Sequence, residues 1–205
     1  MKTINLSKLL RMVRNQADYD DSQFVSDLEL VDTLNFLRTE LYTQVVDRCE
    51  PPRLMVDINL VVSNGLAIIP EDVYKILSVS NEVGEELSEA HFTPVGKKMN
   101  KHTYFLQGDT IRTEAQSINI KYFPIIEDIE LPEEDEDNEW IDDPEIRLIC
   151  PEEAVFLRAG LVSYILTKDE SDPSTAMMEK INAYNRIIST FQQKNIQPYR
   201  VRKVI

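Results

Sequence analysis

The sequence predicts an α+β protein, in which a helical bundle built from both ends of the chain carries a small inserted antiparallel β module. Three observations predict this class. Residues 1–48 have helical periodicity, residues 53–124 read as short strands with tight turns, and helical periodicity returns from residue 150. Because the two helical arms bracket the β insert, we expect them to pack together and to hold the module to one side.

The N-terminal arm, residues 1–50, contains two predicted helices. The first runs from about Leu6 to Gln16 and places its apolar residues on one face: Leu6, Leu9, Leu10 and Val13. After a polar break, Ser26 and Glu29 have the spacing of a capping box. Behind this box one apolar stripe predicts a long helix that ends near Arg48, before two prolines; its members are Leu30, Leu34, Leu37, Leu41 and Val45.

The predicted β module spans residues 51–126. Branched and alternating residues indicate strands over 54–62 and 73–80, with a further short strand after the Asn64-Gly65 turn. Residues 104–112 read as a hairpin, and 117–123 close the module. Five or six short strands with tight connections favour a small antiparallel sheet or a barrel-like fold.

An acidic segment, residues 127–149, follows the β module. It holds twelve carboxylates between Glu127 and Glu145 and no lysine or arginine there, whereas the rest of the chain has 24 acids and 22 bases. Like charges repel and apolar residues are few, so we expect a loop that does not pack. The candidate interaction residues are Glu133, Glu134, Asp135, Glu136, Asp137, Glu139, Trp140, Asp142 and Asp143.

Three interpretations of this acidic segment stay open. It is a solvated loop, it binds a divalent cation, or it faces a partner by pairing with basic groups or by repelling DNA. The glycine and the later glutamate of an EF-hand loop are missing, which disfavours the cation. Trp140 either anchors the segment to the helices or contacts a partner.

The C-terminal helices span residues 150–193. Pro151 and the acids beside it predict a helix start, and the apolar residues that follow predict a mostly buried helix. Asp172 and Pro173 cap a last helix, whose predicted stripe is Met177, Ile181, Tyr184, Ile188 and Phe191.

Residues 194–205 read as an extended arm, rich in bases and free of acids. A disordered tail and a segment that orders on a partner, by strand addition or in a groove, are both open, and nonspecific nucleic-acid binding is disfavoured because the bases are few. The arm's candidate docking residues are Gln197, Pro198, Tyr199, Arg200, Val201, Arg202, Lys203, Val204 and Ile205.

The chain offers little for catalysis or for a cofactor. Two cysteines and two histidines, far apart, disfavour a zinc site, a redox pair or a His-based catalytic centre, and no phosphate-binding glycine motif occurs. We therefore expect no enzyme, no cofactor and no metal, and two reduced cysteines. No stretch is apolar enough for a membrane span or a signal peptide, so we expect synthesis and use in the cytosol.

Several short patterns resemble the head-to-tail adaptor (connector) proteins of tailed bacteriophages, of the tail tubular protein A type. The run from Asn64 to Tyr74 is similar to the family's entry into its β module, an apolar run followed by proline, an acid and an aromatic residue. Tyr104 to Arg112 and Ile118 to Pro124 resemble its aromatic–Gly–Asp hairpin and the strand after it. The order of helices, β insert and helices is similar over nearly the whole chain.

The resemblance implies a virion structural protein of the neck. It implies a ring of identical subunits, twelve in number, that docks under the portal protein and joins the capsid to a tail or nozzle protein. The helical domain would make the subunit contacts and line the channel for passing genomic DNA, without sequence-specific binding. The C-terminal arm would reach the portal, and the β module would face the tail. The long acidic segment departs from the family pattern.

A second hypothesis belongs to another class of function. In it the protein is a cytosolic binding or regulatory module, whose acidic loop captures a basic partner or mimics nucleic acid. Deletion of the acidic segment would abolish binding in that case, whereas an adaptor would still assemble.

Overall fold

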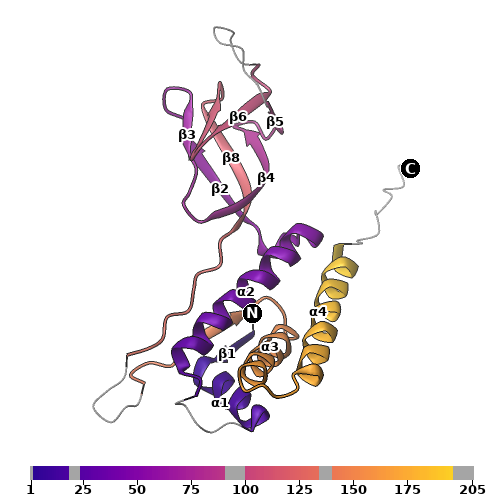
Figure 1. Ribbon diagram of the computed structural model, residues 1–205. Helices are drawn as coiled ribbons and strands as arrows, with labels where there is room; N and C mark the ends of the chain where they lie inside the picture. The colour runs from indigo at the N-terminus through magenta and orange to yellow at the C-terminus, as the bar shows by residue number, and fades with distance from the viewer. Residues whose placement is uncertain (1, 19–23, 91–99, 134–139, 196–205) are drawn as a thin grey trace. The chain divides into compact units, whose positions relative to one another are not determined.

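The computed structural model describes residues 2–18, 24–90, 100–133 and 140–195, and for residues 193–195 it describes the backbone alone. These residues contain helices and antiparallel sheets, and the predicted α+β class is confirmed (Figure 1). The chain forms two compact units, which are described separately below. The helical unit joins Met1–Pro51 to Ile126–Ile205, and the β unit is Pro52–Ile125.

The helical unit contains α1 (Leu6–Ala17), α2 (Asp27–Cys49), α3 (Glu153–Lys168) and α4 (Ser174–Asn195). The predicted capping box is present, since the Ser26 Oγ accepts from the Glu29 backbone N–H at 3.2 Å and the Ser26 N–H donates to the Glu29 carboxylate at 3.1 Å. α3 packs against the other three helices, and α2 also packs against α4. The predicted apolar faces of α1 and α2 are buried in this core.

A two-stranded sheet in the helical unit was not predicted. β1 (Lys2–Asn5) pairs antiparallel with β9 (Glu145–Leu148), with Ile4 opposite Ile146. β9 lies inside the segment that the sequence predicts to be a loop without packing, so this prediction is wrong for its last residues. Ile146 and Leu148 supply the reason, because both are buried and outweigh the charge of their neighbours.

The β unit begins with the 3₁₀ turn Pro52–Leu54 and contains two small sheets. The first has the order β2 (Val56–Val61), β8 (Ser117–Pro124), β4 (Val73–Asn81). The second has the order β3 (Leu66–Ile68), β7 (Thr110–Thr113), β6 (Thr103–Gln107), β5 (Ser88–Glu89). A shared core of buried residues holds the unit together, among them Val79, Ile111, Ile118 and Ile120.

The turns of the β unit follow the sequence closely, with one exception in strand direction. Asn64 (φ 54°) and Gly65 (φ 78°) have the two positive angles of the expected hairpin turn. β5, however, pairs in parallel with β6, which corrects the all-antiparallel prediction. Thirteen residues separate Glu89 from Thr103, and a connection of this length allows a strand to return in the same direction.

Candidate interaction surface on the helical unit

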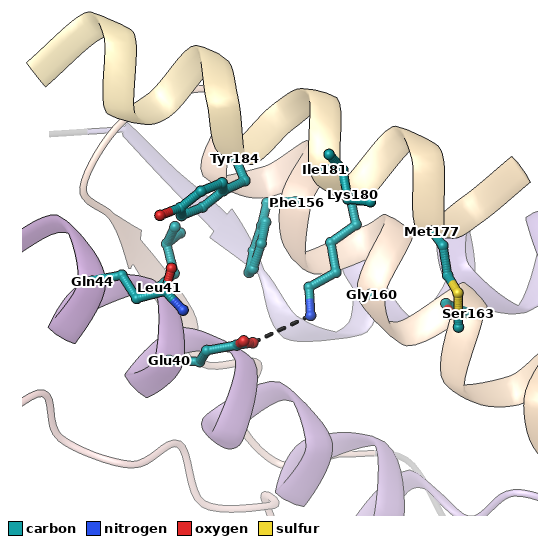
Figure 2. A pocket seen from close by; sticks show the side chains of 10 residues that line it. All are labelled: Glu40, Leu41, Gln44, Phe156, Gly160, Ser163, Met177, Lys180, Ile181 and Tyr184. Carbon is teal, nitrogen blue, oxygen red and sulfur yellow. Dashed lines mark hydrogen bonds and ion pairs between the residues drawn. The ribbon is translucent and has the colours of Figure 1, made fainter. Parts of the chain in front are cut away.

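A groove runs along the helical unit between α2 and α4, with α3 as its floor (Figure 2). Its volume is about 380 Å³. The residues that line it are mostly apolar or uncharged: Glu40, Leu41 and Gln44 from α2, Phe156, Gly160 and Ser163 from α3, and Met177, Lys180, Ile181 and Tyr184 from α4. We call this feature the helical groove. A second, more open hollow continues it across α2 and α3, shares Gly160 and Ser163 with it, and includes Phe36.

Large apolar side chains on this surface remain in contact with solvent. Phe36 is 68% exposed, Ile181 52% and Met177 46%. The predicted stripe of α4 is therefore wrong for Met177 and Ile181. The helix instead turns its alanine-containing side toward the core and buries Ala176, Ala183, Ile187, Ile188 and Phe191. Small side chains let helices approach closely, which explains why this side is inside. The exposed apolar row is the kind of patch that marks a protein contact.

The polar groups of the helical groove are few and mostly neutralised. Lys180 Nζ lies 3.2 Å from Glu40 Oε2 and 5.1 Å from the centre of the Phe156 ring (Figure 2). The Tyr184 hydroxyl is buried and has no hydrogen-bond partner among the described residues. A buried hydroxyl without a hydrogen-bond partner is costly. The groove therefore suits an apolar contact with a few polar anchors.

Gly160 allows the close approach of α3 to α2 on which both hollows depend. A Cβ at this position would lie 2.6 Å from Leu37 Cδ1, and Leu37 is 4% exposed, so its side chain has little room to move.

Gly160→Val is therefore expected to lower the free energy of unfolding by about 1–3 kcal/mol, because overpacking outweighs the gain in helix propensity. Urea denaturation followed by the helical circular dichroism signal measures this loss. Leu37→Ala removes the clashing methyl groups, so the cost of Gly160→Val should be smaller in that background. Equal costs in both backgrounds would contradict the close approach.

The predicted acidic site falls only partly within the described residues. Glu134, Asp135, Glu136, Asp137 and Glu139 lie outside them, and so does the predicted docking arm, Gln197, Pro198, Tyr199, Arg200, Val201, Arg202, Lys203, Val204 and Ile205. Of the remaining acidic-site residues, Glu133, Asp142 and Asp143 are exposed and Trp140 is half-buried.

The flanks of the acidic segment do pack on the helical unit, contrary to the prediction. On α2 the Asn35 side chain donates to the Ile129 carbonyl and accepts from its N–H, both at 2.9 Å. One turn further along α2, the Arg38 guanidinium donates to the Glu127 carbonyl at 3.0 Å. This flank is thus held through its backbone, and its carboxylates Glu127, Asp128 and Glu130 are exposed.

At the other flank of the segment, the Asp143 side chain caps the N-terminus of α1, which is far from it in the sequence. Its carboxylate accepts from the Ser7 backbone N–H at 3.0 Å and from the Ser7 hydroxyl at 2.6 Å, at the first turn of α1. Burial raises the pKa of Asp143, but hydrogen bonds from Ser7 and Asn5 outweigh this and leave the pKa below its ordinary value. Asp143 therefore has a structural role at the N-terminus of α1.

A buried charged cluster beneath the acidic segment has no counterpart in the predictions. Glu153 is 2% exposed, and its carboxylate accepts from the Ile149 N–H at 2.5 Å. Burial raises its pKa to about 7, while the Ile149 N–H and the positive charge of Arg38 act in the opposite direction. Arg38 is 8% exposed, and burial lowers its pKa. Arg38 lies on the same face of α2 as Leu34 and Leu41, and this helical spacing in the sequence could have predicted its burial.

The cysteines agree with the prediction of two reduced thiols. Cys49 and Cys150 form no disulfide and are buried, and burial raises the pKa of Cys150 to about 11. Such a thiol is a weak nucleophile.

Two kinds of feature are absent from the described part of the chain. No group of three histidine, cysteine, aspartate or glutamate side chains there is arranged to hold a metal ion. None of the described helices combines the length and the apolar character that a bilayer crossing requires. Comparison with known proteins adds no assignment, since neither a protein-family model nor a curated protein matches this sequence.

Proposed function

We propose that this protein is a non-enzymatic head-to-tail adaptor of a tailed bacteriophage. In this proposal it forms a ring that docks under the portal protein and joins the capsid to the tail around a channel for DNA. The observation that carries the proposal is the apolar surface of the helical groove and its neighbouring hollow, where Phe36, Met177 and Ile181 are each more than 45% exposed. A surface of this kind needs a protein cover, and in a ring a second copy supplies it.

The charge distribution supports the same function. Twelve carboxylates lie between Glu127 and Glu145, and the start of this segment is fixed to α2 through the backbone of Glu127 and Ile129. A ring repeats every charge in each subunit, so a fixed acidic segment that faces the channel would repel DNA and let it slide. The same fixed segment, facing outward, would pair with basic groups of the portal or of the tail protein.

Negative-stain imaging of the protein mixed with the portal ring of the same phage tests the proposal. We expect additional ring density at one end of the portal. Absence of this density at all concentrations would overturn the adaptor function. Binding of a basic protein by a monomer, lost when the acidic segment is deleted, would favour a binding module instead.

The helical groove provides the variant for this experiment. Phe36→Ser with Ile181→Ser is expected to abolish ring density and self-association while leaving the fold intact, because both side chains are more than half exposed in the subunit. Val83→Ser, which removes a 73% exposed apolar side chain of the β unit, is the matched control and should assemble normally. Native mass spectrometry reads the oligomeric state, and circular dichroism checks the fold. Normal rings from the double variant would move the subunit contact to another surface.

A further inference from the structure

The β unit has a groove of its own, with a chemistry different from that of the helical groove. It lies beside β3, β4 and β6, has a volume of about 750 Å³, and is lined by Ile68, Ile69, Pro70, Glu71, Val73, Tyr74, Ile76, Glu89, Tyr104, Leu106, Gly108 and Asp109. We call it the acidic groove, because its lining includes three carboxylates and no lysine, arginine or histidine.

The carboxylates of the acidic groove are exposed, and its apolar residues are partly so. Glu71, Glu89 and Asp109 are all exposed. Ile68 is 77% and Tyr74 38% exposed, although both are large side chains with β preference. The groove thus combines an apolar lining with three negatively charged groups.

Electrostatics in the groove agree with this description. The Tyr104 side chain is 8% exposed, and its pKa is raised by burial and, in addition, by the negative charges of Glu89 and Glu86. A cation placed there would meet favourable charge from more than one side.

The groove also lies next to an open strand edge. β3 is the outer strand of its sheet and pairs with β7; on its other side Leu66 forms a bridge with Ser63, so the edge that remains for an added segment is at Ile68. An edge strand presents backbone groups to which an extended segment can add, and side chains of that segment then alternate between the two faces. The occupant that fits is therefore an extended chain with alternating apolar and basic residues.

We propose that residues 196–205 of another copy of this chain bind in the acidic groove. In an extended conformation Tyr199 and Val201 point to one face, while Arg200 and Arg202 point to the other. The first pair suits the apolar lining, and the second pair matches the carboxylates in charge. This segment contains no acid, so all its charges agree with the groove.

The inference rests on the proposed function, because a ring provides a neighbouring copy in a fixed position. A segment of one subunit in the groove of the next is a head-to-tail contact, which closes into a ring. Ion pairs at exposed carboxylates contribute little each, so the apolar contacts supply most of the affinity. The segment of one subunit binds either the acidic groove of a neighbour or the portal, but not both at once. In the absence of the portal it binds the acidic groove.

Disulfide trapping on the full-length protein tests the contact without a portal. Two single variants, Ile68→Cys and Val201→Cys, are mixed and oxidised mildly. A covalent dimer of one chain of each kind is expected. Cys49 and Cys150 are buried and have raised pKa values, so wild-type protein gives a low background. Val61→Cys, 79% exposed on β2 and not part of the groove lining, replaces Ile68→Cys in the matched control and should trap at least tenfold less.

Charge-reversal variants test whether disulfide trapping depends on the charges of the groove and of the segment. The triple variant Glu71→Lys, Glu89→Lys, Asp109→Lys in the Ile68→Cys chain should reduce trapping at least tenfold. Arg200→Glu, Arg202→Glu, Lys203→Glu in the Val201→Cys chain should restore it. The inference would be overturned if Ile68→Cys trapped no more dimer than the Val61→Cys control. It would also be overturned if a monomeric chain that carries both Ile68→Cys and Val201→Cys formed the disulfide within itself. If the disulfide does not form but the protein still adds ring density to the portal, only this inference is refuted. If the disulfide forms but no ring density appears on the portal, only the adaptor function is refuted.

Discussion

Arg38→Met is expected to lower the free energy of unfolding of the helical unit by about 1–3 kcal/mol at pH 8. Arg38 is 8% exposed, and its positive charge acts on Glu153, which is 2% exposed. Methionine fills much of the same space but leaves the Glu153 carboxylate buried without a compensating charge. It also removes the donor to the Glu127 carbonyl, which holds the acidic segment on α2.

Urea denaturation measures this loss, followed by the helical circular dichroism signal because all four described α-helices belong to the helical unit. Arg158→Met is the matched control. Arg158 pairs with Glu179 at 2.5 Å, but the two side chains are 25% and 33% exposed, so the expected loss is about 1 kcal/mol or less. Equal losses from the two variants would contradict a stabilising effect of the Arg38 charge on Glu153.

The double variant Arg38→Met, Glu153→Gln separates charge from packing. Once Glu153 carries no charge, the loss of Arg38 leaves no uncompensated carboxylate, so the double variant should be more stable at pH 8 than Arg38→Met alone. The coupling energy from this cycle is expected to be about 1–3 kcal/mol. Additive effects would place the importance of Arg38 in its bond to Glu127 instead.

The sequence predicts the elements whose signals are local. The capping box at Ser26, the leucine stripe of α2 and the Asn64-Gly65 turn each depend on neighbouring residues alone, and the structure confirms all three. The Leu6–Val13 face of α1 follows the same rule. Propensity, capping and periodicity are sufficient there because no distant contact competes with them.

Features that depend on distant contacts were not predictable in this way. β1 and β9 pair across more than 140 residues, and neither is long enough to show a clear alternation. On α4 two adjacent rows are both apolar, and the choice of the alanine-containing row depends on the shape of α3. The helical groove, the acidic groove and the buried cluster at Glu153 follow from such choices, so composition alone does not reveal them.

The pH dependence of stability is the second large effect, and it arises from Glu153. Burial raises the pKa of this carboxyl group from 4.5 to about 7 in the folded protein. A group whose pKa is higher in the folded state binds its proton more tightly there. Its stabilising contribution is therefore full below pH 4.5 and is lost as the pH rises through about 7. Between pH 5 and pH 8 the wild-type protein should lose about 2–3 kcal/mol of unfolding free energy from this group.

This window separates Glu153 from the other shifted carboxylates. The pKa values of Glu29, Asp143 and Asp172 are lowered, so their contributions are lost only as the pH falls below their unfolded values of 4.5 or 3.8. Glu153→Gln keeps an acceptor for the Ile149 N–H but cannot ionise, so the slope between pH 5 and pH 8 should largely disappear. Urea denaturation at half-unit steps of pH gives the slope of unfolding free energy against pH for the wild-type protein and for Glu153→Gln. A wild-type stability that stays level or rises across this range would show that Arg38 and the Ile149 N–H compensate the buried charge fully. In that case Glu153 would be ionised at neutral pH.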